Sequence, residues 1–204
     1  MGLHLDRKVN TKRGHRHWFL PAAIVALSAL IEAGGDPARE WLRYDRAAIE
    51  GGEIWRLLSG HFAHLGLTHL ALNLAGLILV WALVGSRLPG TVWLAIVSFV
   101  VAFISGCFWF FDQGLTWYVG LSGLLHGLLI SGACAGLSRW RAESFTILAL
   151  VFGKIIYEQI AGPLPGSELT SGGSVVVNAH LYGAVAGLII GLLRWHRVER
   201  GSDI

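Results

Sequence analysis

Long stretches of apolar residues dominate the chain, and short polar segments separate them. Crossing a hydrocarbon layer of about 30 Å takes about 20 predominantly apolar residues in an α-helix. Four runs reach that length, and two shorter runs contain charged residues, Glu32 in the first and the pair Lys154 and Glu158 in the fifth. The pattern therefore predicts six membrane-spanning helices, over 18–33, 65–84, 92–111, 117–137, 145–160 and 175–193.

These runs predict one all-α integral membrane domain over residues 18–195. A basic N-terminal segment, 1–17, precedes it, and a short tail, 196–204, follows it. The basic leader and the small residues around 26–29 also resemble a signal peptide. Cleavage there would leave the other predicted spans unchanged.

The composition excludes an ordinary soluble enzyme. Hydrophobic residues make up 54% of the chain, charged residues only 14%, and the mean hydropathy is +0.58, whereas soluble domains carry about 25% charged residues. The net charge of +3 would suit a nucleic-acid-binding protein, but the basic residues lie at the chain ends and in short loops. We therefore expect membrane lipids, and no nucleic acid, around the domain.

The distribution of basic residues predicts the orientation. With the N-terminus inside, eleven Lys and Arg residues fall in cytoplasmic segments and four in external ones. Because positively charged loops stay on the cytoplasmic side, we expect a multi-pass protein of the inner (plasma) membrane with both termini in the cytoplasm. The second, fourth and sixth spans then all run from outside to inside.

Few polar side chains lie inside the predicted spans, and they fall at matching positions. His69 and Asn73 lie one turn apart in the second span, Ser122 lies in the fourth, and His180 lies in the sixth, each near the outer end. At about 1.5 Å of rise per residue, they sit roughly 6 to 8 Å below the starts of their runs. Because polar residues inside a bilayer are costly without a partner, the shared depth predicts one functional site open to the outer, periplasmic side.

These residue types suit serine hydrolysis. A neutral imidazole can take the proton of a neighbouring hydroxyl, so Ser122 and His180 are predicted to form a catalytic dyad. No Asp or Glu lies in the fourth or sixth span, so we expect His180 to lack the orienting carboxylate of a triad. His69, Asn73 and the backbone N–H of Ser122, beside Gly120, would stabilise the oxyanion. This chemistry requires no metal or other cofactor.

Glycines favour the meeting of the serine and the histidine. Gly183, Gly187 and Gly191 recur every fourth residue after His180, a spacing typical of closely packed membrane helices. Taken singly, a serine or a histidine in a membrane helix is usually a packing residue. At one depth and flanked by glycines, the two favour catalysis.

Two other site chemistries fit parts of the sequence. A haem or metal protein is suggested by five clustered histidines, although no Cys or carboxylate completes a metal site; they are His61, His64, His69, His126 and His180. A Ser and Lys hydrolase could use Lys154. Glu158, four residues further on, offers that lysine an ion-pair partner instead, which favours a structural pair.

Four short motifs resemble the rhomboid family of intramembrane serine proteases. Trp55 and Arg56 match its WR pair, His69 and Asn73 its HxxxN motif, residues 120–123 its GxSG motif, and residues 179–187 its AHxxGxxxG motif. The resemblance covers about residues 50–195 and implies a six-helix rhomboid-like bundle. It also implies that Ser122 and His180 are the catalytic dyad, His69 and Asn73 the oxyanion donors, and Trp55 and Arg56 structural anchors of the first loop. A non-catalytic relative that only binds membrane helices is the alternative within this fold.

One position departs from the common pattern. Many rhomboids have Tyr four residues after the nucleophile, where this chain has His126. The variant resembles the rhombosortase branch, which implies that the substrates are exported proteins with a C-terminal transmembrane tail that begins with Gly-Gly. For His126 we expect a supporting role, by stacking on His180, by a hydrogen bond or by packing.

Overall fold

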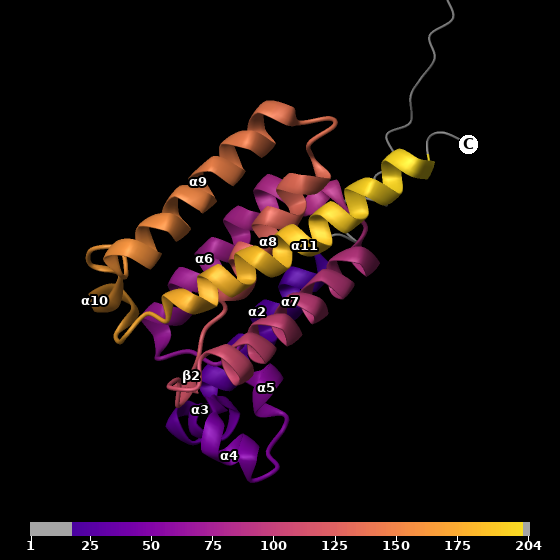
Figure 1. The fold of residues 1–204 in the computed structure, drawn as a ribbon. Helices are drawn as coiled ribbons and strands as arrows, with labels where there is room; N and C mark the ends of the chain where they lie inside the picture. The colour runs from indigo at the N-terminus through magenta and orange to yellow at the C-terminus, as the bar shows by residue number, and fades with distance from the viewer. Residues whose placement is uncertain (1–17, 202–204) are drawn as a thin grey trace, which may run out of the picture.

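A computed structural model describes the backbone of residues 18–201 and the side chains of residues 18–194 (Figure 1). The predicted basic segment 1–17 and the last three residues of the predicted tail lie outside the described residues. In chain order, the elements are α2 (Phe19–Ala33), α3 (Gly35–Leu42), β1 (Tyr44–Asp45), α4 (Arg46–Glu50), α5 (Arg56–Ser59), α6 (Leu67–Val84), the 3-10 helix η1 (Gly85–Arg87), α7 (Gly90–Phe111), β2 (Trp117–Tyr118), α8 (Ser122–Ala135), α9 (Arg141–Ala161), α10 (Ser167–Ser171) and α11 (Val177–Gly201).

The prediction of an all-α membrane fold is confirmed, because an apolar helix occurs at each of the six predicted positions. Among the described residues, α6, α7, α9 and α11 are long and apolar enough to cross a membrane. Helix α2 reaches that length only together with α3, from which it is bent by 118°. Helix α8 has 14 residues, which is short for a complete crossing. The count of six complete spans therefore stays a prediction.

The predicted start of the fourth helix is wrong. Residues 117–121 are apolar but form strand β2 and a turn, so α8 begins at Ser122. Helices α6 and α11 likewise begin two residues later than predicted. His69, Ser122 and His180 consequently lie in the first turns of α6, α8 and α11, which replaces the estimate of their depth from the apolar runs.

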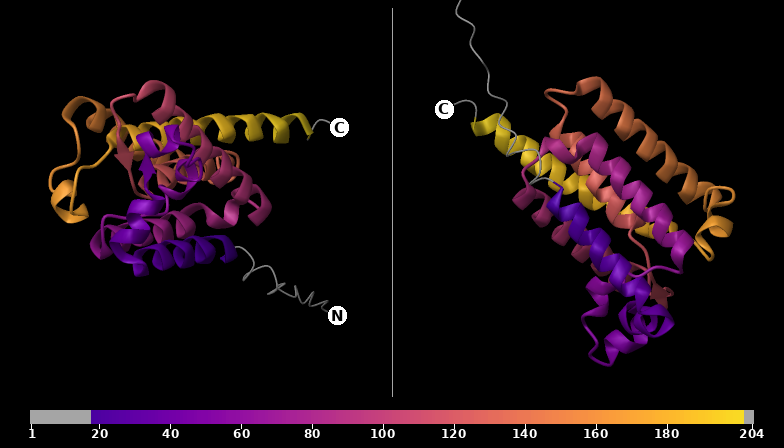
Figure 2. Two further views of the ribbon diagram at one scale, coloured as in Figure 1. Left: turned by 90° about the horizontal axis from the view of Figure 1, so that it is seen from below. Right: turned by 180° about the vertical axis from the view of Figure 1, so that it is seen from behind.

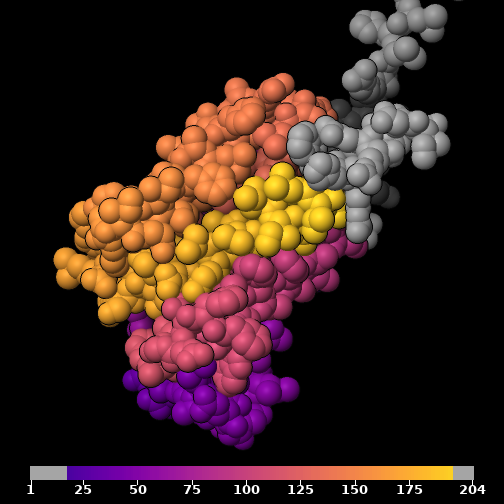
Figure 3. Space-filling view, viewed as in Figure 1, coloured from indigo at the N-terminus to yellow at the C-terminus, as the bar shows by residue number. Residues whose placement is uncertain are grey.

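Helix α8 lies at the centre of the bundle, with α6, α7, α9 and α11 packed around it (Figures 1 and 2). Its closest neighbour is α11, which runs beside it and continues to Gly201. Helix α9 lies along one side of α11 (Figure 3), and the short α10 that follows it packs against α6. Longer apolar helices thus surround the short helix that begins with Ser122.

Apolar side chains both fill the bundle and cover its outside. Trp81 and Trp93 are buried with their rings 5.2 Å apart, and the Trp93 indole N–H donates to the Gly85 carbonyl. On the outer surface, four leucine and isoleucine side chains of α6, α7 and α9 are 56 to 83% exposed: Leu79, Leu94, Leu150 and Ile160. Such surfaces suit a hydrocarbon environment.

The segment between α2 and α6 folds at one end of the bundle, where α3, α4 and α5 lie together (Figure 1). Strand β1 pairs antiparallel with β2, Tyr44 opposite Tyr118. The Arg46 guanidinium donates to the carbonyls of Phe108 and Asp112 at the end of α7, at 2.6 and 3.1 Å. This cation satisfies carbonyls that the helix end leaves free and joins the segment to the bundle.

Candidate active site

Strand β2 and a glycine turn place Ser122 as the first residue of α8. The Gly120 N–H donates to the Gly60 carbonyl at 3.1 Å, and the Tyr118 hydroxyl donates to the Gly120 carbonyl at 2.6 Å. Gly120 has a φ of +133°, a conformation that glycine adopts far more readily than other residues. The turn is thereby fixed from two sides, and Ser122 follows it directly.

Helices α8 and α11 bring Ser122 and His180 together, as the sequence predicted. The Ser122 Oγ lies 2.9 Å from the His180 Nε2. A Cβ atom added to Gly183 would come within 2.8 Å of the Gly123 carbonyl carbon, and one added to Gly123 within 2.8 Å of the Ala179 oxygen. The prediction that glycines permit close packing below His180 is confirmed, and this packing allows the short contact.

The second ring nitrogen of His180 faces a carboxylate, so the prediction that the histidine lacks one is wrong. Glu158 of α9 places its Oε2 2.8 Å from the His180 Nδ1. The predicted ion pair between Lys154 and Glu158 is present, at 2.7 Å, and the Lys154 ammonium also lies 3.2 Å from the same Nδ1. The carboxylate was missed because it comes from the fifth helix, outside the two helices considered. The Lys154 and Glu158 pair therefore contacts His180 as well as bridging two turns of α9.

His126 makes two of the contacts considered for it. Its ring stacks on that of His180, with centroids 4.4 Å apart and planes inclined by 22°. Its Nδ1 lies 2.7 Å from the Ser122 carbonyl oxygen, to which a protonated Nδ1 would donate. His126 therefore contacts both members of the pair, while its part in any reaction stays a prediction.

His69 of α6 lies against the turn that precedes Ser122. Its Nδ1 accepts the backbone N–H of Leu65 at 3.3 Å, so in a neutral ring the Nε2 carries the proton and is a donor. A Cβ atom added to Gly120 would lie 3.3 Å from this Nε2. The buried Asn73 amide donates to the His69 carbonyl at 3.0 Å, and its second N–H is available to another acceptor.

Residues 51–197 match the model of the Rhomboid family, described as a Rhomboid domain. The chain belongs to the rhomboid family. It is similar to the Rhomboid protease GlpG of Yersinia enterocolitica serotype O:8 / biotype 1B (strain NCTC 13174 / 8081), with 32% identity over 180 residues. That alignment covers 83% of this chain and 57% of GlpG, so the chain spans little more than half of that relative's length.

The family match confirms the rhomboid resemblance and, with the apolar helices, a multi-pass membrane protein. Within the rhomboid domain, Trp55 and Arg56 hold the first loop together. The buried Arg56 donates to the Glu40 carbonyl and to the Glu53 carboxylate, both at 2.6 Å. The Trp55 indole N–H donates to the Trp41 carbonyl at 3.3 Å. These contacts agree with the predicted anchoring role.

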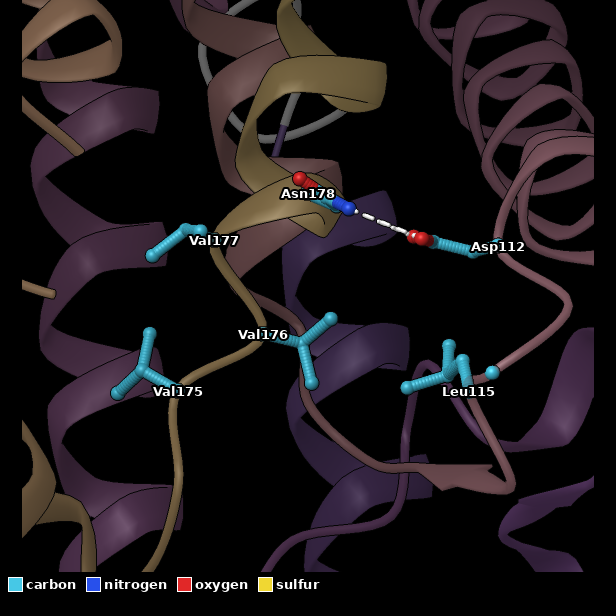
Figure 4. A pocket seen from close by; sticks show the side chains of 7 residues that line it. Asp112, Leu115, Val175, Val176, Val177 and Asn178 are labelled. Carbon is cyan, nitrogen blue, oxygen red and sulfur yellow. Dashed lines mark hydrogen bonds between the residues drawn. The ribbon is translucent and has the colours of Figure 1, made fainter. Parts of the chain in front are cut away.

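A pocket of about 310 Å³ opens beside the start of α11 in this rhomboid domain (Figure 4). At its edge, the Asn178 amide points toward Asp112 and lies 2.9 and 3.0 Å from its two carboxylate oxygens. The Tyr182 hydroxyl also donates to Asp112, at 3.3 Å. These residues tie the end of α7 to the first turn of α11, which carries His180. Neither Asp112 nor Asn178 was among the predicted site residues.

The histidines of the first loop are packed into the protein. His61 is buried, and its Nε2 lies 2.9 Å from the Ser105 hydroxyl. Burial lowers the pKa of His61 to about 3 and that of His64 to about 4. Both rings are therefore neutral near pH 7. Among the side chains of residues 18–194, no group of three His, Cys, Asp or Glu residues could hold a metal ion.

Lys154 does not offer Ser122 an alternative base in this arrangement. Its ammonium contacts the His180 Nδ1, whereas Ser122 contacts the Nε2 on the other side of the ring. The ammonium is also engaged by Glu158. The geometry favours His180 over Lys154 as the proton acceptor for Ser122.

Proposed function

We propose that the protein is an intramembrane serine endopeptidase in which Ser122 is the nucleophile and His180 the general base. The observation that supports this best is the distance of 2.9 Å between the Ser122 Oγ and the His180 Nε2, within reach for direct proton transfer. Membership of the rhomboid family and the similarity to a rhomboid protease point the same way.

The reaction proceeds in two halves. The Ser122 Oγ forms a bond to the scissile carbonyl carbon while the His180 Nε2 takes the hydroxyl proton. The C–N bond then breaks, and Nε2 returns that proton to the leaving amine. A water molecule, deprotonated by the same nitrogen, attacks the resulting ester, releases the carboxyl product and restores the hydroxyl of Ser122.

The negative charge on the carbonyl oxygen is stabilised at the turn before α8. The backbone N–H of Ser122 has no acceptor within its own helix because it belongs to the first turn, and the helix dipole favours an anion there. The His69 Nε2 lies beside Gly120, and Asn73 has one amide N–H left. These donors form the oxyanion site that we propose.

The substrate is a transmembrane segment of another protein. A helix keeps its carbonyls in its own hydrogen bonds, so it must unwind before Ser122 can attack. Each glycine inside a helix is about 1 kcal/mol less favourable than alanine, so a Gly-Gly pair makes unwinding easier. The substrates that we propose are exported proteins with a C-terminal tail of Gly-Gly, a hydrophobic helix and basic residues. Such substrates are implied by the resemblance of this chain, at His126, to the rhombosortase branch.

The orientation follows from the distribution of Lys and Arg. Eleven basic residues on one side and four on the other favour cytoplasmic termini in an inner membrane. The first turns of α6, α8 and α11 then face the periplasmic side. Cleavage at the outer boundary of the tail releases the folded substrate domain outward.

Co-expression with a model substrate tests this function. The substrate joins a folded reporter to Gly-Gly, a hydrophobic helix and an Arg-rich end, and mass spectrometry determines the C-terminus of the released reporter. We expect cleavage at or beside Gly-Gly by the wild type, none by Ser122→Ala, and none when the pair is replaced by Leu-Leu. A folded Ser122→Ala protein that still cuts would contradict the catalytic assignment. Efficient cutting of the Leu-Leu tail, or a cut in the middle of the helix, would contradict the substrate assignment.

A further inference from the structure

A buried carboxylate and a lysine meet the catalytic histidine on the side away from Ser122. Glu158 is 3% exposed and His180 5% exposed, and the Glu158 Oε2 lies 2.8 Å from the His180 Nδ1. The Lys154 ammonium lies 2.7 Å from the other oxygen of Glu158 and 3.2 Å from the same Nδ1. Three helices, α8, α9 and α11, therefore contribute to one connected group of polar side chains.

The two neighbours of the His180 Nδ1 favour opposite tautomers. An ionised carboxylate only accepts hydrogen bonds, so its contact requires a proton on Nδ1 and leaves Nε2 free to accept the Ser122 hydroxyl. An ammonium only donates, so a bond from Lys154 to Nδ1 would put the proton of a neutral ring on Nε2. Such a histidine cannot take a proton from Ser122. The shorter distance, to Glu158, favours the reactive tautomer.

Lys154 lowers the cost of placing the carboxylate at this depth. Removing a carboxylate from water is expensive unless it is paired and its oxygens accept hydrogen bonds. One oxygen of Glu158 accepts from Lys154 and the other faces the imidazole, and the ammonium side chain is itself 29% exposed. Lys154 is thus positioned mainly by its ion pair with Glu158, and its contact with the His180 Nδ1 is secondary.

We propose that Glu158 is a positioning residue that converts the Ser122 and His180 pair into a Ser-His-Glu triad, with Lys154 as the counter-ion of the carboxylate. The proposal rests on the proposed function. Glu158 holds the Nδ1 proton, fixes the ring orientation and stabilises the imidazolium that forms when Nε2 takes the serine proton. The stacked His126 fixes the ring plane from α8. The triad is assembled from a third helix, which neither catalytic residue occupies.

The test measures how fast Ser122 reacts with a fluorescent fluorophosphonate, a probe that needs no knowledge of the natural substrate. In soluble serine proteases, replacing the triad carboxylate by its amide lowers kcat by about ten-thousandfold. We expect Glu158→Gln to lower the maximal labelling rate per folded molecule by about 100-fold to 10,000-fold, with a much smaller change in the half-saturating probe concentration. Glu158→Asp keeps the charge and should therefore label faster than Glu158→Gln. The expected gain is at least about 1.6-fold to 2.5-fold, which is a tenth of the loss on a logarithmic scale.

Two further variants separate positioning from mere stability. Glu143→Gln removes the exposed partner of Arg87 in another ion pair, and it should label at the wild-type rate. Glu158→Gln combined with Lys154→Met should label faster than Glu158→Gln alone, because the freed ammonium no longer donates to Nδ1. Thermal unfolding gives the folded fraction for every variant.

The outcomes distinguish the two proposals. If the wild type is not labelled at Ser122, or if folded Ser122→Ala still cuts the model tail, the proposed function fails. If Ser122 is labelled in the wild type and folded Glu158→Gln reacts within about threefold of it, the triad alone is overturned. A Glu158→Asp variant no faster than Glu158→Gln would also overturn it, because the charge would then have no effect.

Discussion

The close approach of α8 and α11 makes Gly183→Ala a severe test of the geometry. The added Cβ would overlap the Gly123 carbonyl oxygen, which is its nearest neighbour, and would lie 2.8 Å from the Gly123 carbonyl carbon, whereas carbon atoms in contact prefer about 3.5 to 4.0 Å. Both neighbouring atoms belong to the Gly123 backbone, so the two helices must separate by at least about 1 Å to relieve the overlap. An equal shift would stretch the 2.9 Å contact between Ser122 and His180 beyond hydrogen-bond reach.

Both stability and reactivity should then fall. Overpacking typically costs about 1 to 3 kcal/mol, and a misplacement of about 1 Å can reduce catalysis by about a hundredfold. We expect a lower Tm in detergent micelles and a labelling rate of Ser122 about a hundredfold below the wild type.

Gly106→Ala on α7 is the matched control, because a Cβ there meets nothing within 4 Å. It should keep the wild-type rate and lose no stability, since alanine favours a helix. A Gly183→Ala protein with an unchanged Tm and labelling rate would refute the close packing that the reasoning assumes.

Substitutions at three other positions probe the surroundings of the site. Asn73→Ala should lower cleavage by about 100-fold to 1000-fold with little change in Tm; a lower Tm with intact specific activity would make Asn73 a packing residue. His126→Phe should retain more labelling than His126→Ala, because a phenyl ring preserves the stacking on His180; equal rates would exclude a stacking role. Arg46→Gln should destabilise the fold by about 1.5 to 3 kcal/mol through lost charged hydrogen bonds to carbonyls, measured as a lower Tm at an unchanged rate per folded molecule.

The sequence predicted the helices and the pairing of Ser122 with His180 because both depend on regular spacing. Apolar runs mark the helices, and glycines every fourth residue mark the face on which α11 meets α8. The start of α8 was misplaced because hydropathy does not distinguish an apolar strand and turn from an apolar helix. Residues 117–121 satisfy either interpretation.

The other contacts between helices distant in the chain could not be predicted from the sequence. Glu158 reaches His180 only because α9 packs against both α8 and α11. Its spacing from Lys154 fitted an ion pair within one helix equally well. Asp112 and Asn178 are 66 residues apart, and no local sequence pattern in either segment predicts that they are in contact.

The central claim is that Ser122 is a nucleophile activated by His180, and the most direct measurement is the location of a covalent adduct. The wild-type protein and the His180→Ala variant are treated with a fluorophosphonate, digested and analysed by peptide mass spectrometry. We predict that the phosphonyl group is on Ser122 in the wild type and absent from the folded His180→Ala variant. An adduct on another residue, or equal modification of Ser122 without His180, would contradict the account.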